Sequence, residues 1–427
     1  MSAAPVDTDP AEPTPPSRWA RTFSSLELPE YRRLWFAGAL SFAAMPMQAV
    51  ARGFLAFELT GTNSALGLVF LGMGLPMLIA TPFGGVAADR LPKRTVLFFS
   101  NGVLALSAIA IAIALLTDSL QFWMLVVSAA FQGASFAFIA PTRLAFSAEL
   151  VGRDRLVNAI LLAQISMNAT RVIGPGLAGA LIGIAVVGPE GVYLLLSLIL
   201  LSALVMITRL PRGEPIERSG RTSPFDDIRA GLGYVRAHPE IGRPTFLSLL
   251  VVAAAFPYVS FLPSLVDDVL GGGPGWLGAL SSVGAVGAVV VSLRIAGRRD
   301  ARITDHHLAL SGLAFGFGVA LLGVVPGLWI ALGAAFVAGA GTAAFQSLSN
   351  SLVLLRADEQ YHGRVQSLLM LGFSAFGIFA APLGALADAI GLRTTLVLMG
   401  TVTWVAVGAM SWLARRHPVD AIEVADD

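Results

Sequence analysis

Apolar residues are gathered into long runs along this sequence, and short polar segments separate one run from the next. Each run is roughly 20 residues or longer, the length that an α-helix needs to cross about 30 Å of hydrocarbon. The runs begin near these residues: Leu34, Ser64, Thr95, Gln121, Leu156, Gly191, Thr245, Gly275, His307, Leu328, Val365 and Thr394. The pattern therefore predicts an all-α polytopic membrane protein with twelve transmembrane helices.

Residues 211–243 form the longest polar stretch, and they separate six of the predicted helices from the other six. The stretch is rich in arginine and contains a short amphipathic segment around 225–235. We therefore expect two six-helix halves joined by a linker. The expected parts are a cytoplasmic tail (1–33), an N-terminal half (34–210), a cytoplasmic linker (211–243), a C-terminal half (244–414) and a second cytoplasmic tail (415–427).

Small residues and prolines repeat between the two halves. Gly133 in the fourth run matches Gly339 in the tenth, and Pro175 in the fifth matches Pro382 in the eleventh, each about half a chain apart. The repeat indicates pseudo-symmetry, although Gly/Ala-rich membrane helices also resemble one another through composition alone. Repeated halves commonly place a substrate site at their interface near the middle of the membrane.

Basic residues are concentrated in alternate connections. Arg90, Lys93 and Arg94 follow the second run, and more arginines follow the fourth, eighth and tenth, whereas the connection around Asp118 has no lysine or arginine. By the positive-inside rule, we expect both termini in the cytoplasm and the helices in a bacterial inner (plasma) membrane. Arg393, between the last two runs, is the one exception.

Composition agrees with a surface that lipid surrounds. Hydrophobic residues make up 56% of the chain and charged residues only 13%, against about 25% charged in soluble domains. The chain has no cysteine, which excludes disulfides and thiolate chemistry. Because the basic residues are dispersed between the runs, we expect the lipid bilayer and a small molecule as partners, and not nucleic acid. We expect a monomer.

The segment Gly85–Arg94 lies in the short connection between the second and third runs. A glycine lets helices approach closely, and an acid at a helix end pairs with arginines or caps a neighbouring helix. Such a network would latch one conformation, and an ordinary positive-inside loop is the alternative. The expected latch residues are Gly85, Asp89, Arg90 and Arg94.

This segment resembles the signature loop of the major facilitator superfamily, although Pro92 stands where that family usually has glycine. Further segments resemble the secretion-effector branch of the superfamily, which includes siderophore exporters and macrolide and multidrug efflux carriers. They are Glu30–Trp35, Pro141–Arg143, Glu149–Val151, Arg155–Ala159 and Arg171–Pro175. The resemblance implies the major facilitator fold of two pseudo-symmetric halves, secondary-active export by alternating access, and no enzymatic activity.

The fifth run resembles the antiporter motif of facilitator-type exporters at Gly174, Pro175 and Gly179. Proline within a helix cannot donate its backbone hydrogen bond, so we expect a kink. Arg171 lies past the middle of this run, where a charge is costly and should face the protein interior or a water-filled cavity. A packing arginine that satisfies backbone carbonyls is the alternative.

Other polar residues recur on the runs that line the cavity in facilitator folds. That their side chains converge is implied by the resemblance, and for each of them an interhelical hydrogen bond is the alternative to a contact with the cargo. The expected substrate-binding residues are Gln48, Arg52, Gln132, Gln164, Asn168, Arg171, Tyr258, Gln346 and Asn350.

No carboxylate is expected near the middle of the membrane. Glu58 and Asp267, near the outer ends of their runs, are the candidates for a proton site. The family implies a proton gradient as the energy source and no cofactor. Arg52 and Arg171 without a central acid would make the cavity electropositive, which favours an anionic or neutral amphipathic cargo, such as a siderophore or drug, over lipophilic cations.

Neither a metal site nor an enzyme site is indicated. His306 and His307 are adjacent on one predicted helix, so their side chains would point apart, and no phosphate-binding loop follows a strand. Export is the leading hypothesis. Uptake or facilitated diffusion of a metabolite is the alternative within transport, and a membrane-embedded enzyme or sensor is the alternative from another class.

Overall fold

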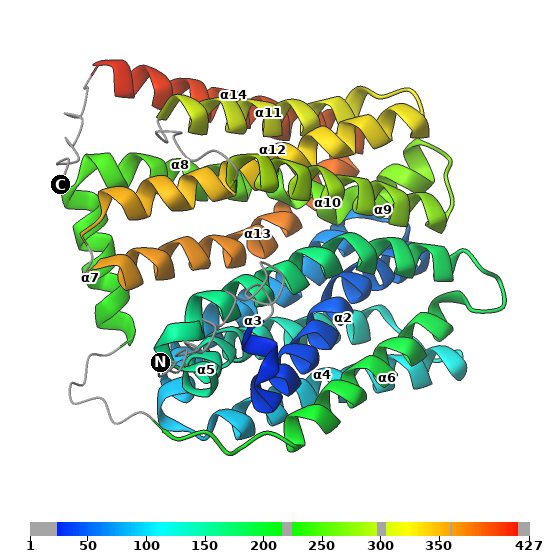
Figure 1. Cartoon of the computed structure of the whole chain (residues 1–427). Helices are drawn as coiled ribbons and strands as arrows, with labels where there is room; N and C mark the ends of the chain where they lie inside the picture. The colour runs from blue at the N-terminus through cyan, green and yellow to red at the C-terminus, as the bar shows by residue number, and fades with distance from the viewer. Residues whose placement is uncertain (1–23, 216–223, 297–304, 359–360, 417–427) are drawn as a thin grey trace, which may run out of the picture.

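The computed structural model describes residues 24–215, 224–296, 305–358 and 361–416, and within these ranges it contains helices and no strand (Figure 1). The N-terminal half consists of η1 (Ser24–Glu27), α2 (Pro29–Thr60), α3 (Asn63–Arg90), α4 (Lys93–Leu116), α5 (Phe122–Ile182) and α6 (Gly188–Thr208). The remaining elements are α7 (Pro224–Ala237), α8 (Pro239–Ala255), η2 (Phe256–Phe261), α9 (Leu262–Ser264), η3 (Leu265–Val269), α10 (Pro274–Ala296), α11 (Asp305–Val324), α12 (Leu328–Arg356), α13 (His362–Ile390) and α14 (Leu392–Arg416).

Twelve segments of the described chain correspond to the twelve predicted transmembrane helices. Eleven are long and apolar enough to cross a membrane, and the apolar part of α13 is shorter. α5 holds two of them, because the backbone of Gly152 leaves helical geometry (φ 71°, ψ 174°). The seventh membrane segment is divided into four elements, α8, η2, α9 and η3. It contains Pro257 and Pro263, which cannot donate a backbone hydrogen bond within a helix. The fold predicted from the apolar runs is therefore confirmed.

The two halves use the same helix crossing. In the N-terminal half, Gly133 of α5 faces the backbone of Met73 in α3, and in the C-terminal half Gly339 of α12 faces the backbone of Gly284 in α10. A side chain at either glycine would overlap the facing carbonyl oxygen. The glycines that repeat along the sequence thus occupy equivalent close contacts with the backbone of a facing helix.

Ion pairs close each half at one end of the bundle. We call the end where the chain enters α2 and leaves α14 the terminal end, and the opposite one the far end; α7 lies at the terminal end, on the left of Figure 1. There the almost fully buried Lys93 pairs with Glu149 (Nζ to Oε2, 2.8 Å), and its ammonium also donates to the carbonyl of Glu214. Arg356 and Asp305 form the corresponding pair in the other half.

Close contacts between the halves lie toward the far end. A side chain at Gly74 of α3 would lie 2.8 Å from the Cα of Gly377 in α13, and Gly67 of α3 faces the α13 backbone even more closely. On the other side of the bundle, Gly179 of α5 packs on Gly278 of α10. Since each of these glycines lies in the part of its helix nearer the far end, the structure is closed there.

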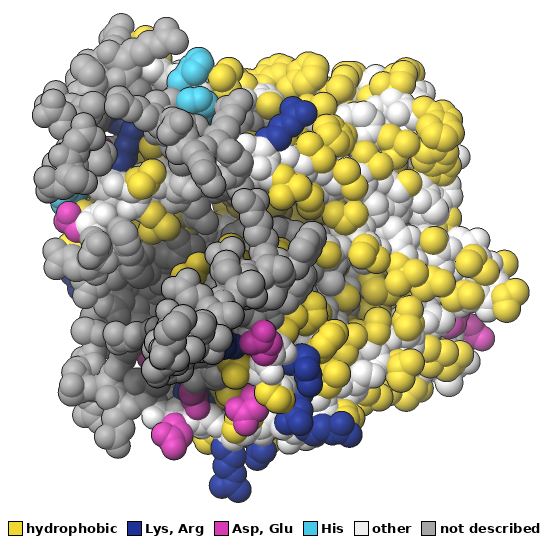
Figure 2. All heavy atoms as spheres, viewed as in Figure 1, with side chains coloured by type: hydrophobic (Ala, Val, Ile, Leu, Met, Phe, Trp, Pro, Cys, Tyr) yellow, Lys and Arg dark blue, Asp and Glu magenta, His cyan; other side chains and the backbone are white. Residues whose placement is uncertain are grey.

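The outer surface is apolar. Phe99 and Leu106 of α4 and Leu198 of α6 are each more than 60% exposed, with values of 66%, 68% and 62%. Figure 2 shows hydrophobic side chains covering much of the visible face away from the terminal end. Such a surface is stable in lipid and not in water.

Candidate functional site

Two glycine contacts fix how the second part of α5 is turned. Gly174 packs on Pro46 of α2, and a Cβ at this glycine would lie 2.8 Å from the proline Cγ. Gly179 packs on α10 of the other half, and its Cβ would lie 2.5 Å from the Cα of Gly278. α5 therefore touches its own half on one side and the opposite half on another, which leaves two free faces between these contacts.

A polar stripe occupies one of these free faces. Gln164 and Arg171 are exposed, and Asn168 is half-buried. Helical geometry places all three on one of the two faces that lie between the contacts of Gly174 and Gly179. Exposed apolar residues, including Ile173 and Leu177, fall on the opposite free face. The apolar face therefore suits lipid, and the polar stripe is directed at the space between the halves.

Arg171 is exposed although protein surrounds it closely. This combination is expected in a recess between the halves and not on the convex outer surface. Its guanidinium forms no ion pair with a carboxylate of the described residues. Among the described residues, Arg171 is thus a cation without an ionic partner, on a stripe that helical geometry turns toward the space between the halves.

Three other predicted residues come together inside the N-terminal half. Arg52 of α2 donates to the side-chain oxygen of Gln132 in α5, and Gln132 Nε2 donates to Gln48 Oε1 at 3.0 Å. All three side chains are only 2–3% exposed. Arg52 Nε and Nη1 and Gln48 Nε2 are buried donors with no hydrogen-bond partner among the described residues.

Tyr193 of α6 completes this buried group. Its hydroxyl is also buried without a partner in the described chain, and it lies within electrostatic range of the Arg52 guanidinium. We call Gln48, Arg52, Gln132 and Tyr193 the donor cluster. Because unpaired buried donors are costly, the cluster suits a group that accepts hydrogen bonds, such as an anion or an ordered water.

The predicted residues of the C-terminal half lie apart from the donor cluster. Tyr258 in η2 is buried, packs edge-on against Phe315 with ring centroids 6.1 Å apart, and hydrogen-bonds to Thr342 of α12. Gln346 is half-buried, with its Nε2 unpaired among the described residues, and Asn350 is exposed. The nine residues predicted to bind cargo therefore form separate groups and not one cluster.

The residues of the predicted latch differ in their surroundings. Arg94 donates to a backbone carbonyl just beyond the end of α6, Asp89 is half-buried and Arg90 is exposed. A side chain added at Gly85 would meet nothing within 4 Å. In this conformation the close helix approach is made by Gly84, which faces the backbone of α5.

The predicted kink motif lies where α5 crosses α10. Pro175 is buried there and leaves the carbonyl four residues earlier without its usual helical donor. Ser282 of α10 donates its hydroxyl to the next carbonyl along the chain, that of Val172, at 2.8 Å. Gly174, Pro175 and Gly179 thus belong to a contact between the halves.

The two acids predicted as a proton site come from opposite halves. Glu58 at the end of α2 lies within electrostatic range of Asp267 in η3 and of Glu190 in α6. All three are at the far end. Across the described residues, no group of three or more histidine or acidic side chains has the arrangement of a metal site.

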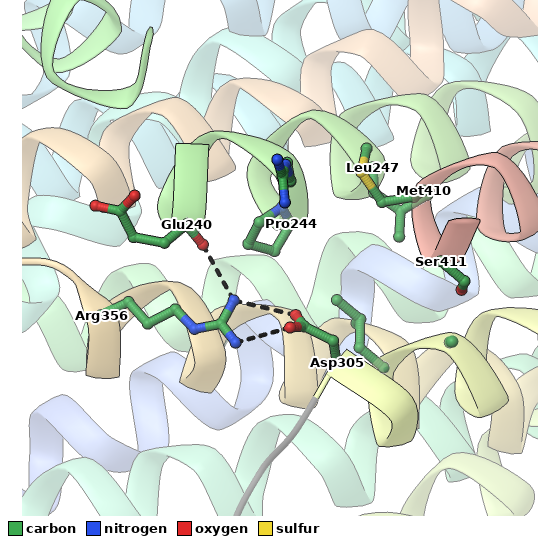
Figure 3. A pocket seen from close by; sticks show the side chains of 10 residues that line it. Glu240, Pro244, Leu247, Asp305, Arg356, Met410 and Ser411 are labelled. Atoms are coloured by element: carbon green, nitrogen blue, oxygen red, sulfur yellow. Dashed lines mark hydrogen bonds and ion pairs between the residues drawn. The ribbon is translucent and has the colours of Figure 1, made fainter. Parts of the chain in front are cut away.

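A pocket at the terminal end lies within the C-terminal half (Figure 3). Arg356 points at Asp305 and forms two hydrogen bonds with its carboxylate, of 2.9 and 3.0 Å, and a third of 3.1 Å with the carbonyl of Glu240. Leu247 and Met410 are among the other residues that line it. Because the arginine is already paired and the pocket lies inside one half, this is not the space between the halves.

Three polar residues of the structure were not among the predicted site residues. Tyr193 joins the donor cluster, Arg143 lies buried with its guanidinium 4.6 Å from the ring centroid of Phe42, and Asp388 joins the halves at the far end. Only Asp388 has a clear signal in the sequence, because its neighbours repeat the spacing of Gly85–Arg94.

Both a family profile and individual known proteins match the sequence of this chain. The sequence profile of the transmembrane secretion effector family matches residues 20–426. The enterobactin exporter EntS of Salmonella typhi is 24% identical, over 94% of this chain and 98% of its own length. Macrolide efflux protein A of Streptococcus pyogenes is 21% identical, over 87% and 93% of the two chains, and the staphyloferrin A transporter of Staphylococcus aureus is 23% identical, over 81% and 87%.

Solved transporter structures share the fold. A bacterial homologue of the human lysosomal transporter Spinster superposes with a TM-score of 0.71 at 16% identity, over 94% of this chain and 98% of that one. The nucleoside transporter NupG gives a TM-score of 0.68 at 12% identity, over 90% and 98%.

These matches extend over nearly the whole chain and agree with its twelve spans, its two halves and its signature loop. The matched family and proteins are transporters and not enzymes. The chain therefore belongs to the transmembrane secretion effector family of the major facilitator superfamily and is a membrane transporter.

Proposed function

We propose that this transporter is a monomeric, secondary-active exporter of a small amphipathic or anionic molecule, which it moves by alternating access. The proposal is carried by Arg171, an exposed cation on the polar stripe of α5 that has no ionic partner among the described residues. A charge at the centre of a membrane costs about 2.5–3.5 kcal/mol and is typically functional. An anionic group on the cargo would offset this cost, which a lipophilic cation could not do.

The conformation fits the loading step of an exporter. From the basic residues at the terminal end, we infer that this end and both termini lie in the cytoplasm of a bacterial cell. Because the glycine contacts close the far end, we infer that the space between the halves opens toward the cytoplasm in this conformation. Export would follow when the far end opens and the terminal end closes around bound cargo.

Relatives favour export over uptake. Two of them are named an enterobactin exporter and a macrolide efflux protein, and the family itself is described as a secretion effector. A catecholate siderophore would supply the negative charge that Arg171 lacks, and a neutral lipophilic drug would avoid repulsion. We propose these two classes as the cargo.

We further propose that a proton gradient drives transport through Glu58 and Asp267. These acids belong to opposite halves and lie within electrostatic range of each other at the far end. A movement of the halves would change their separation, so proton binding and conformation would be coupled.

Flux across proteoliposomes tests the proposal. With a catecholate siderophore as the anionic probe and a neutral lipophilic dye as the second, Arg171→Gln should reduce anionic flux by about tenfold or more, because a charge-assisted contact is lost. Neutral flux should stay within about twofold of the unmodified protein. Arg171→Lys is the matched control, since it keeps the charge and should retain most of the anionic flux.

Equal losses for both probes would assign Arg171 to folding and remove the argument for anionic cargo. Absence of flux for every probe, in either direction and with a proton gradient of either sign, would count against transport of these two classes altogether.

A further inference from the structure

Asp388 joins the two halves at the far end. It lies near the end of α13 in the C-terminal half, and its carboxylate accepts hydrogen bonds from the first two residues of α3 in the N-terminal half. The backbone N–H groups of Asn63 and Ser64 donate at 2.7 and 2.8 Å, Asn63 Nδ2 donates at 3.1 Å, and the Ser64 hydroxyl donates as well. Asp388 therefore caps the N-terminus of a helix from the opposite half.

A glycine one turn earlier allows this contact. Gly384 faces the backbone of Asn63 so closely that a side chain there would overlap its carbonyl oxygen. Gly384 and Asp388 lie on the same face of α13, because they are four residues apart in a helix. The close approach and the cap thus form one device.

The sequence around Asp388 repeats the spacing of the signature loop. Glycine, aspartate and arginine stand at Gly85, Asp89 and Arg94 across the α3–α4 turn, and at Gly384, Asp388 and Arg393 across the α13–α14 turn, with identical separations. The seventh positions after the glycines are the turn residues Pro92 and Gly391.

The two arginines also make equivalent contacts. Arg94 donates to the carbonyl of Leu210, just beyond α6, at 3.0 Å. Arg393 donates to the carbonyls of Gly323 and Val325 around the end of α11, at 3.4 and 2.9 Å. Each arginine is the second residue of the helix that follows the turn, and it anchors that turn to the end of a neighbouring helix, one at the terminal end and the other at the far end. This also explains why a basic residue stands at the far end.

We propose that Gly384, Asp388 and Arg393 form a second latch, which holds the far end closed and acts in opposition to the latch of the signature loop. In this conformation Gly384 is packed against α3, whereas Gly85 faces open space among the described residues. The far latch is therefore engaged here. The inference rests on the alternating access of the proposed function, but it does not depend on the cargo.

Distances between spin labels test the second latch without cargo. The chain has no cysteine, so paired cysteines introduce labels at chosen sites only. Ser119 and Pro326 are exposed in far-end connections of the two halves, and Leu91 and Leu355 are exposed at the terminal end. Asp388→Ala should shift the population toward longer far-end distances by about fivefold, the scale of losing one helix cap.

Three further variants make the result specific. Ser64→Ala removes one donor and should give a smaller shift of the same sign, whereas Asp89→Asn should shift the population in the opposite direction. Asp268→Asn removes another exposed acid at the far end and should leave the distances unchanged. Size-exclusion profiles establish that each variant is folded.

The second latch would be overturned if folded Asp388→Ala and Ser64→Ala left the far-end distances as they were. A shift of equal size in Asp268→Asn would also overturn it, because the effect would then follow charge and not the cap. Failure of transport in the flux experiment would not change these distances, so the two proposals can fail separately.

Discussion

Gly179→Ala is expected to abolish most transport while leaving the protein folded. The added methyl group would lie 2.5 Å from the Cα and 2.6 Å from the nitrogen of Gly278 in α10, which are backbone atoms that cannot rotate away. Overpacking of this kind costs about 1–3 kcal/mol. Because the contact joins the two halves and exists only when the far end is closed, the cost falls on that conformation. Far-end label distances should lengthen, and proteoliposome flux should fall by about tenfold.

Gly183→Ala is the matched control, at the C-cap of the same helix. Its added methyl group would meet its nearest neighbours at 3.5 Å, which is ordinary contact. Flux and far-end distances should stay close to those of the unmodified protein. If Gly179→Ala behaved like Gly183→Ala, the α5–α10 contact would not be a gate, and closure of the far end would need another explanation.

Gln132→Leu is expected to destabilise the N-terminal half strongly. Gln132 is the acceptor for the buried Arg52 guanidinium, whose other donors already lack partners among the described residues. A hydrogen bond to a charged group contributes about 1.5–3 kcal/mol, and leaving the charge unpaired adds to the loss. The melting temperature in detergent should fall by several degrees.

The double variant Arg52→Met/Gln132→Leu should recover most of this loss, since both polar groups are replaced by apolar ones of similar size. A bound anion that acts as a partner for Arg52 would also stabilise the unmodified protein in a concentration-dependent way. If Gln132→Leu and the double variant melted at the same lowered temperature, the contact between these two side chains would not be the source of the stability.

The fold followed from the sequence because hydrocarbon thickness sets helix length. In lipid, every backbone N–H and C=O must be hydrogen-bonded within the helix, so the helix extends across the whole apolar run. The helices predicted to begin near Leu156 and Thr394 accordingly begin at Arg155 and Leu392. The internal form of the seventh span was not predictable in this way. The 3₁₀ and π segments η2 and η3 depend on how the chain packs around Pro257 and Pro263.

The site was predictable only in part. Helical spacing placed Gln48 and Arg52 on one face of α2, but hydrophobic periodicity does not say whether a polar face meets a cavity or another polar face. The two arginines differ in the structure, because the Arg52 side chain is buried against Gln132 whereas Arg171 is exposed.

Long-range contacts were beyond the reach of local patterns. Lys93 looked like one more base of a cytoplasmic loop, yet it is buried and paired with Glu149. The contact between Asp388 and Asn63 joins residues 325 positions apart, so only the fold brings them together.

Alternating access is the central claim, and paired distances at the two ends test it most directly. The distances Ser119 to Pro326 and Leu91 to Leu355 should be measured in lipid nanodiscs for the unmodified protein, Asp388→Ala and Gly179→Ala, with and without the siderophore probe. The account predicts that every condition that lengthens the far-end distance shortens the terminal-end distance, because the halves rock as rigid bodies. Distances that lengthen together, or a terminal end that never responds, would contradict it.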